Sequence, residues 1–169
     1  MSVLFVLPAE TIYDRQHRVM GWKATPSPRE SLKQLKGIIP RLRELGAAAV
    51  VYSDFDVDSG YLLAKRLGVP FEEWMCLRRL NVGKHHGASA SQFAKLEQEM
   101  SRIWTEKPDI PIKGGDSLTS FKKRVSALGD KLESLQTTTL VVADERIIKA
   151  LTGATGPLER GRVYEWRSH

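Results

Sequence analysis

The sequence predicts an α/β fold, a three-layer α/β/α sandwich with a mostly parallel central sheet. Two observations predict it. Short apolar runs rich in β-branched residues occupy 2–7, 47–52 and 138–143, which is the pattern of strands buried on both faces. Segments with apolar residues at three- and four-residue spacing separate these runs and are typical of amphipathic helices. Strands that alternate with helices favour a parallel sheet covered on both sides.

The first half of the chain contains two expected helices. Residues 29–45 have apolar positions on one helical face, and Pro40 should kink or split this helix because proline removes a backbone donor. Gly46 follows as the expected end. A second helix is expected over 57–67, closed by Gly68.

The second half repeats this alternation. A helix is expected over 91–106, followed by a loop rich in proline and glycine over 107–115. Asp116 or Ser117 can cap the next helix, since both side chains accept hydrogen bonds from free backbone N–H groups. Apolar residues within 147–151 predict one more helix.

The remaining segments complete a single domain that spans 1–169. A short strand is expected within 69–80 and an edge strand at 161–166, whereas 8–28 and 81–90 are expected to be irregular. A chain of 169 residues is long enough to bury one core, and neither an internal repeat nor a linker divides it.

Composition indicates an ordinary globular protein in a reducing compartment. Hydrophobic residues make up 41% and charged residues 27% of the chain. Cys76 is the single cysteine, so an intramolecular disulfide cannot form. The apolar run at 2–7 is short and lacks a preceding basic region, so we expect a strand there and not a signal peptide. Apolar stretches stay well below the roughly 20 residues of a membrane span, so a cytoplasmic protein with no membrane partner is expected.

The net charge of +6 permits an anionic ligand or nucleic acid but does not require either. In parallel sheets, ligands bind at the carboxyl ends of the strands. These ends are expected at Leu7–Thr11, Ser53–Asp56 and Asp144–Arg146, which places the candidate site there.

A motif follows the first strand and places several residue types in a fixed order. The residues are Glu10, Thr11, Arg18, Gly21, Trp22 and Pro26. This segment resembles the opening motif of the histidine phosphatase (phosphoglycerate mutase-like) family, in which Arg-His-Gly-Glu-Thr precedes an Asn, an Arg, a Gly-Trp pair and a Pro.

Further segments match that family in the same order along the chain. They are Val51–Phe55, Tyr61–Gly68, Gly114–Ser117 with Phe121, Arg124 and Val125, then Leu140–Ala143 and Ile147–Leu151. The resemblance therefore covers nearly the whole chain and implies a phosphoglycerate mutase-like fold.

The resemblance also implies a reaction whose residues are replaced in this chain. The family uses a nucleophilic histidine, two arginines, a second histidine and a general acid around the phosphate. In register, Leu7 stands at the first arginine, Pro8 at the nucleophilic histidine and Ala9 at the glycine after it. The second arginine is expected in the stretch around Val57, which has no arginine. Asp144 stands at the second histidine, Arg79 at the general acid and Asp14 at the phosphate-contacting Asn. Proline has no nucleophilic side chain. We therefore expect no catalytic residue of the family type, and a catalytically inactive relative.

Charge supports the same expectation. Asp56, Asp58, Asp144 and Glu145 are expected near the position of the phosphate. A phosphate carries about two negative charges near neutral pH and would be repelled by neighbouring carboxylates.

A basic segment at 78–86 is a second candidate ligand contact, because it has three cations and two histidines but no acid. The candidates are Arg78, Arg79, Lys84, His85 and His86, in addition to Glu10, Asp14, Arg18 and Asp144 near the strand ends. A solvated loop is the simpler interpretation. A divalent metal between Glu10, Asp14, His17 and Asp144 is conceivable, but an ordinary polar cleft without metal or other cofactor is favoured.

Three functions stay open at this point. The first is a binding or scaffold protein for an unknown protein or anionic ligand, with a homodimer possible from related folds. The second is an enzyme whose carboxylates perform altered acid–base chemistry. The third is a weak, salt-dependent contact with nucleic acid through 78–86.

Overall fold

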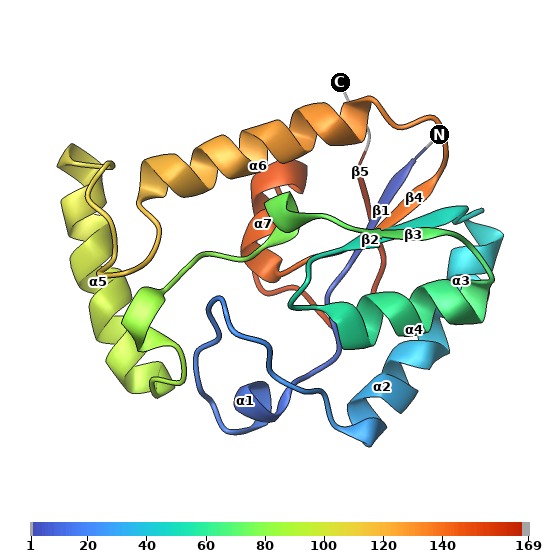
Figure 1. Ribbon diagram of the computed structural model, residues 1–169, viewed down its shortest axis with the longest axis horizontal. Helices are drawn as coiled ribbons and strands as arrows, with labels where there is room; N and C mark the ends of the chain where they lie inside the picture. The colour runs from blue at the N-terminus through green and yellow to red at the C-terminus, as the bar shows by residue number, and fades with distance from the viewer. Residues whose placement is uncertain (1, 167–169) are drawn as a thin grey trace.

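The computed structural model describes residues 2–166, and its centre is a five-stranded sheet (Figure 1). The spatial order of the strands is β3-β2-β4-β1-β5. Their bounds are β1 (Val3–Val6), β2 (Ala49–Tyr52), β3 (Phe71–Glu73), β4 (Thr139–Val142) and β5 (Tyr164–Trp166). Four strands are parallel and β5 runs antiparallel to β1, so the predicted mostly parallel α/β sheet is confirmed.

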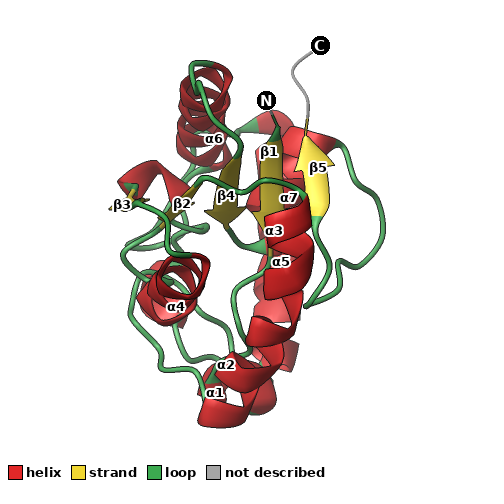
Figure 2. Cartoon of the chain, turned by 90° about the vertical axis from the view of Figure 1, so that its right-hand side faces the viewer, coloured by secondary structure: helices red, strands yellow, loops and turns green. Residues whose placement is uncertain are grey.

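Helices cover both faces of this sheet. Their bounds are α1 (Ile12–Arg15), α2 (Arg29–Leu35), α3 (Ile39–Glu44), α4 (Val57–Leu67), α5 (Ala90–Glu106), α6 (Leu118–Glu133) and α7 (Glu145–Thr152), with short 3-10 turns η1 (Lys36–Ile38), η2 (Met75–Leu77) and η3 (Gly83–His85). Figure 2 shows α6 and α4 on opposite sides of the strands. Among the described residues, none of these helices combines the length and the apolar character needed to cross a membrane.

Alternation along β1 explains the two core layers. Phe5 packs in one buried cluster with Leu128 of α6 and Ile147 of α7, whereas Leu4 packs in the other with Leu63 of α4. Successive side chains of a strand point to opposite faces, so a fully apolar strand must have a core on each side.

Helix boundaries follow the predicted stop residues. Pro40 splits the expected 29–45 helix into α2, the turn η1 and α3, and it lies at the first turn of α3, where a missing N–H costs little. Gly68 ends α4 with φ of 75°, a left-handed conformation that glycine adopts without a Cβ clash. Ser117, not Asp116, is the N-cap of α6.

Two short elements differ from the simplest sequence interpretation. Residues 8–28 contain the single-turn helix α1, held by a capping box between Thr11 and Asp14. The strand expected within 69–80 is β3, and its three residues are exposed, not buried, because β3 forms one edge of the sheet.

Candidate functional site

The candidate site lies where β1, β2 and β4 end. In the paired strands, Val6 lies beside Val142, and Val142 lies beside Tyr52, so the three parallel strands end level with one another. The segments that follow them, including Pro8, Ser53–Asp56 and Asp144, therefore share one edge of the sheet, as the sequence predicted.

Arg79 is the central cation of this edge. Its Nη2 atom lies 2.9 Å from Oδ1 of Asp56, and the side chains of Arg79 and Asp56 are only 11% and 5% exposed. The hydroxyl of Ser53 donates to the other carboxylate oxygen of Asp56 at 2.7 Å. Burial lowers the pKa of Arg79, but the carboxylates of Asp56, Asp144 and Asp14 outweigh burial and raise this pKa overall. The arginine therefore stays a cation inside an acidic shell.

Asp144 also interacts with the charge of Arg79 and has a different environment from Asp56. It is the N-cap of α7 and accepts a hydrogen bond from the Ile147 N–H at 3.2 Å. Burial raises the pKa of Asp144, and the charge of Asp56 raises it further, although Arg79 and backbone donors oppose both effects. The carboxyl group of Asp144 therefore loses its proton less readily than an ordinary aspartate does.

Asp14 connects this cation to a second arginine. The Thr11 N–H donates to Oδ2 of Asp14 at 2.7 Å, which fixes the carboxylate at the start of α1. Arg160 lies 3.2 Å from the same Oδ2 atom and also donates to the carbonyl of Pro8 at 3.2 Å. We call Asp14, Asp56, Arg79, Asp144 and Arg160 the carboxyl-end cluster. Because it alternates three carboxylates with two guanidinium groups, its charges largely offset one another.

Arg124 fixes the position of Arg79 without joining the cluster. Its guanidinium donates to the carbonyls of Arg78 and Arg79 and pairs with Asp116 at 2.8 Å. Trp22 donates from Nε1 to the same Arg79 carbonyl at 2.6 Å. The backbone that presents Arg79 is therefore clamped from two sides.

Several residues that the sequence placed near the site lie outside the cluster. Glu10 pairs with Arg15 at 3.0 Å on the surface, and Arg18 donates to the carbonyl of Gly87. Asp58 accepts from the Ser27 N–H in an exposed position. The neighbouring acid Glu145 pairs with Lys149 and also accepts the Leu158 N–H.

The expectation that four carboxylates gather near the phosphate position is therefore corrected in part. Of the four carboxylates expected near the phosphate position, Asp56 and Asp144 join the cluster, whereas Asp58 and Glu145 have other contacts. Positive charge comes from Arg79, which the family register placed at the general-acid position, and from Arg160, which the sequence interpretation did not include.

The basic segment 78–86 does not form one continuous cationic surface. Arg78 turns to Asp54, with Nη2 2.6 Å from Oδ2, and Arg79 turns into the cluster. Lys84 is exposed, and His85 is half-buried in η3. His86 accepts the Gly21 N–H at Nδ1 (3.0 Å). One ring nitrogen of His86 is therefore already occupied by the backbone.

The residues that the sequence resemblance aligns with the family's catalytic positions make structural contacts here. Leu7 is buried in the core, and Pro8 is buried beside it. The Ala9 N–H donates to the hydroxyl of Ser59 at 2.8 Å, and Val57 is the partly exposed first residue of α4. Within residues 2–166, no group of three or more His, Cys, Asp or Glu side chains could hold a metal ion.

Comparisons with known proteins fit this architecture. A family model described as the histidine phosphatase superfamily (branch 1) matches residues 6–168. No curated protein matches the chain.

Solved structures give the same fold. The protein TTHB049 of Thermus thermophilus is 21% identical, with a TM-score of 0.75 over 98% of this chain and 92% of that one. A phosphoglycerate mutase from the same organism is 22% identical over the same shares, with a TM-score of 0.73. A structure named mycobacterial hydrolase 1 is 19% identical over 89% of this chain and 76% of that one, with a TM-score of 0.71.

Proposed function

Because the chain belongs to the histidine phosphatase superfamily, we propose that it is a member without phosphatase activity that acts as a binding or scaffold protein. The observation that carries this proposal is the carboxyl-end cluster itself. Arg79, its most buried cation, is enclosed by Asp56, Asp144 and Asp14. A phosphate at this place would have to displace carboxylates that already satisfy the arginine.

The end of β1 supports the proposal. Phosphoryl transfer to the protein needs a side chain with a free lone pair near the phosphorus atom. Pro8 stands at the position that aligns with the family's nucleophilic histidine, and its carbonyl accepts a hydrogen bond from Arg160. A buried proline cannot accept a phosphoryl group on its side chain.

His86 is not a substitute nucleophile. Its Nδ1 atom accepts the Gly21 N–H, so the neutral ring has its proton on Nε2. Burial lowers the pKa of His86, and the charges of Lys23 and Arg79 lower it further. The ring is therefore neutral near pH 7, with one nitrogen occupied and the other protonated.

A hydrolysis assay tests the proposal. The full chain is incubated with para-nitrophenyl phosphate between acidic and basic pH, alongside the variants Arg79→Gln and Arg41→Gln. Arg41 lies in an exposed ion pair with Glu44 and serves as the matched control. We expect no turnover that depends on Arg79. Turnover that survives in Arg41→Gln and disappears in Arg79→Gln, with circular dichroism showing that Arg79→Gln is still folded, would contradict the proposal.

Acid–base chemistry is the second candidate function, and one observation favours it. Asp144, which lies within the electrostatic range of Arg79, has a raised pKa, so its carboxyl group can hold a proton at a higher pH than an ordinary aspartate does. This would be chemistry without phosphoryl transfer. If Asp144→Asn and Asp56→Asn both abolish a proton-transfer activity that wild type shows on a small carbonyl substrate, this second function replaces the first.

Binding to nucleic acid through 78–86 receives less support. Arg78 and Arg79 are both engaged by carboxylates from the β2–α4 connection, and Lys84 remains the exposed cation of that segment. A mobility-shift assay at low salt tests it, since phosphate contacts give strongly salt-dependent binding. We expect no shift that Lys84→Gln removes.

A further inference from the structure

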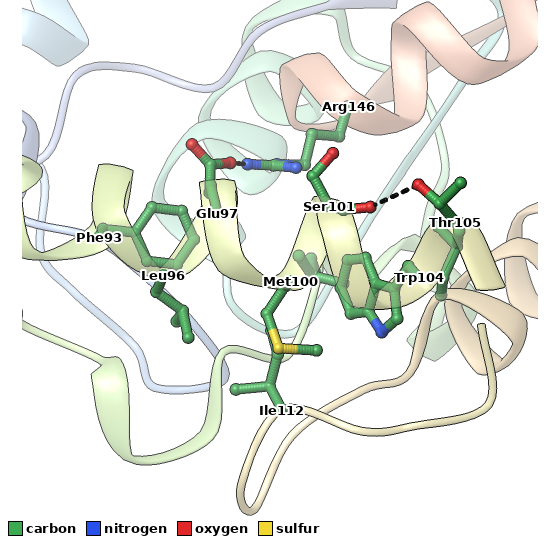
Figure 3. A pocket seen from close by; sticks show the side chains of 11 residues that line it. Phe93, Leu96, Glu97, Met100, Ser101, Trp104, Thr105, Ile112 and Arg146 are labelled. Carbon is green, nitrogen blue, oxygen red and sulfur yellow. Dashed lines mark hydrogen bonds and ion pairs between the residues drawn. The ribbon is translucent and has the colours of Figure 1, made fainter. Parts of the chain in front are cut away.

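A groove with a volume of about 420 Å³ runs along α5. α5 lies to one side of the sheet and beside the start of α6 (Figure 1). Figure 3 shows the groove from close by, with Phe93, Leu96, Met100 and Trp104 projecting from α5 and Ile112 facing them from the loop. The volume is within the range of roughly 300–1,000 Å³ that is typical of small-molecule sites.

The interior of the groove is apolar. Met100 and Ile112 form its buried side at 7% and 3% exposure. The Trp104 indole N–H donates to the Ile110 carbonyl at 2.7 Å, and the Thr105 hydroxyl donates to the Ser101 carbonyl at 2.9 Å. Because these donors are already bound by the protein, the walls favour an apolar molecule.

One charged pair borders the groove. Arg146, in the first turn of α7, pairs with Glu97 of α5, and each side chain is about half-exposed, at 46% and 45%. A guanidinium has five N–H donors and can bind a second carboxylate while it keeps the first.

We propose that this groove binds a small organic acid, with the apolar body along α5 and the carboxylate on Arg146. The proposal rests on the proposed function, because it names the class of ligand that a binding protein of this kind would take. Arg146 is two residues from Asp144, so the charged end of the groove lies next to the carboxyl-end cluster. The ligand and the cluster would then be neighbours but would use different residues.

Isothermal titration calorimetry of the full chain with octanoate and with octanol tests the head group. We expect saturable binding of octanoate that is tighter than binding of octanol. Arg146→Gln should weaken octanoate binding about fivefold, as for a half-exposed ion pair, and leave octanol binding unchanged. Lys95→Gln, on an exposed part of α5 outside the groove, is the charge-matched control and should bind octanoate like wild type.

A second variant pair tests the place of binding. Ser101 is exposed and lines the groove, so Ser101→Phe should fill it and reduce octanoate binding at least as strongly as Arg146→Gln. Gln98→Phe adds the same side chain to α5 outside the groove and should have no effect. Absence of saturable octanoate binding, equal binding of octanol, or equal effects of the members of either variant pair would overturn the inference. These outcomes are independent of the phosphatase assay, whose result decides the proposed function alone.

Discussion

Arg79 and Asp56 form an ion pair that is nearly closed to solvent, and this pair joins the segment after η2 to the end of β2. Ser53 supports Asp56 from the other side. The arrangement matters for stability because a buried charge without its partner destabilises the fold strongly, whereas an intact buried pair changes the free energy of unfolding little.

Removal of Arg79 alone should therefore destabilise the fold strongly. Arg79→Met leaves Asp56 buried and unpaired, and we expect a loss of about 3 to 5 kcal/mol in the free energy of unfolding. The double variant Arg79→Met, Asp56→Asn should lose less than the single one. Urea denaturation followed by circular dichroism measures both, and a double variant less stable than Arg79→Met would refute the explanation.

The raised pKa of Asp144 predicts that the stability of the protein depends on pH. Its folded pKa is raised above the ordinary 3.8, so the protonated form stabilises the fold and this stability is lost as pH rises through the folded pKa. Asn keeps the helix cap but cannot ionise. Asp144→Asn should stabilise the protein more at pH 7 than at pH 4, as measured by urea denaturation at each pH. An equal effect at both pH values would contradict the raised pKa.

The ion pair between Asp116 and Arg124 predicts that the fold is sensitive to acid. Burial alone would raise the pKa of Asp116, but the hydrogen bonds from Arg124 and the Asn81 N–H outweigh it and lower the pKa below 3.8. The stability that this carboxylate contributes is present above 3.8 and is lost as pH falls through its folded pKa. Arg124→Gln should move the midpoint of acid unfolding to higher pH. The exposed Arg41→Gln should leave that midpoint in place.

Gly60 predicts a steric effect at the junction of α4 and β2. A Cβ atom at this position would overlap the ring of Tyr52, which is buried at 1% exposure. Gly60→Ala should cost about 1 to 3 kcal/mol in the free energy of unfolding, despite the better helix propensity of alanine. Gly37→Ala, where a Cβ atom would meet nothing within 4 Å, is the matched control and should not destabilise the protein in thermal unfolding.

The sequence predicted the sheet and most helices because their periods are encoded locally. Pro40 and Gly68 ended or split helices through their own backbone chemistry, which needs no tertiary contact. The exposure of β3 was not predictable in this way, because an edge position depends on which strands pair, and Phe71 resembles a core residue in sequence.

The charges of the candidate site were harder to predict than its location. Strand ends located Asp56 and Asp144 correctly, since parallel strands must end at one edge. Arg160 reaches Pro8 from 152 positions away, and no local pattern marks such a contact. Arg79 appeared to belong to a basic loop because its carboxylate partners lie in other segments. Ion pairs between segments that are distant in sequence therefore determine the charge of the carboxyl-end cluster.

The antiparallel pairing of β5 with β1 determines how the molecule would respond to mechanical load. Val3, near the start of the chain, lies opposite Trp166, near its end. A force that pulls these two positions apart would open the ladder one hydrogen-bonded pair at a time from that end. The other strands of the sheet would not be loaded in shear. In an optical-trap experiment β5 should detach first and at low force, before the core between the two helical layers opens.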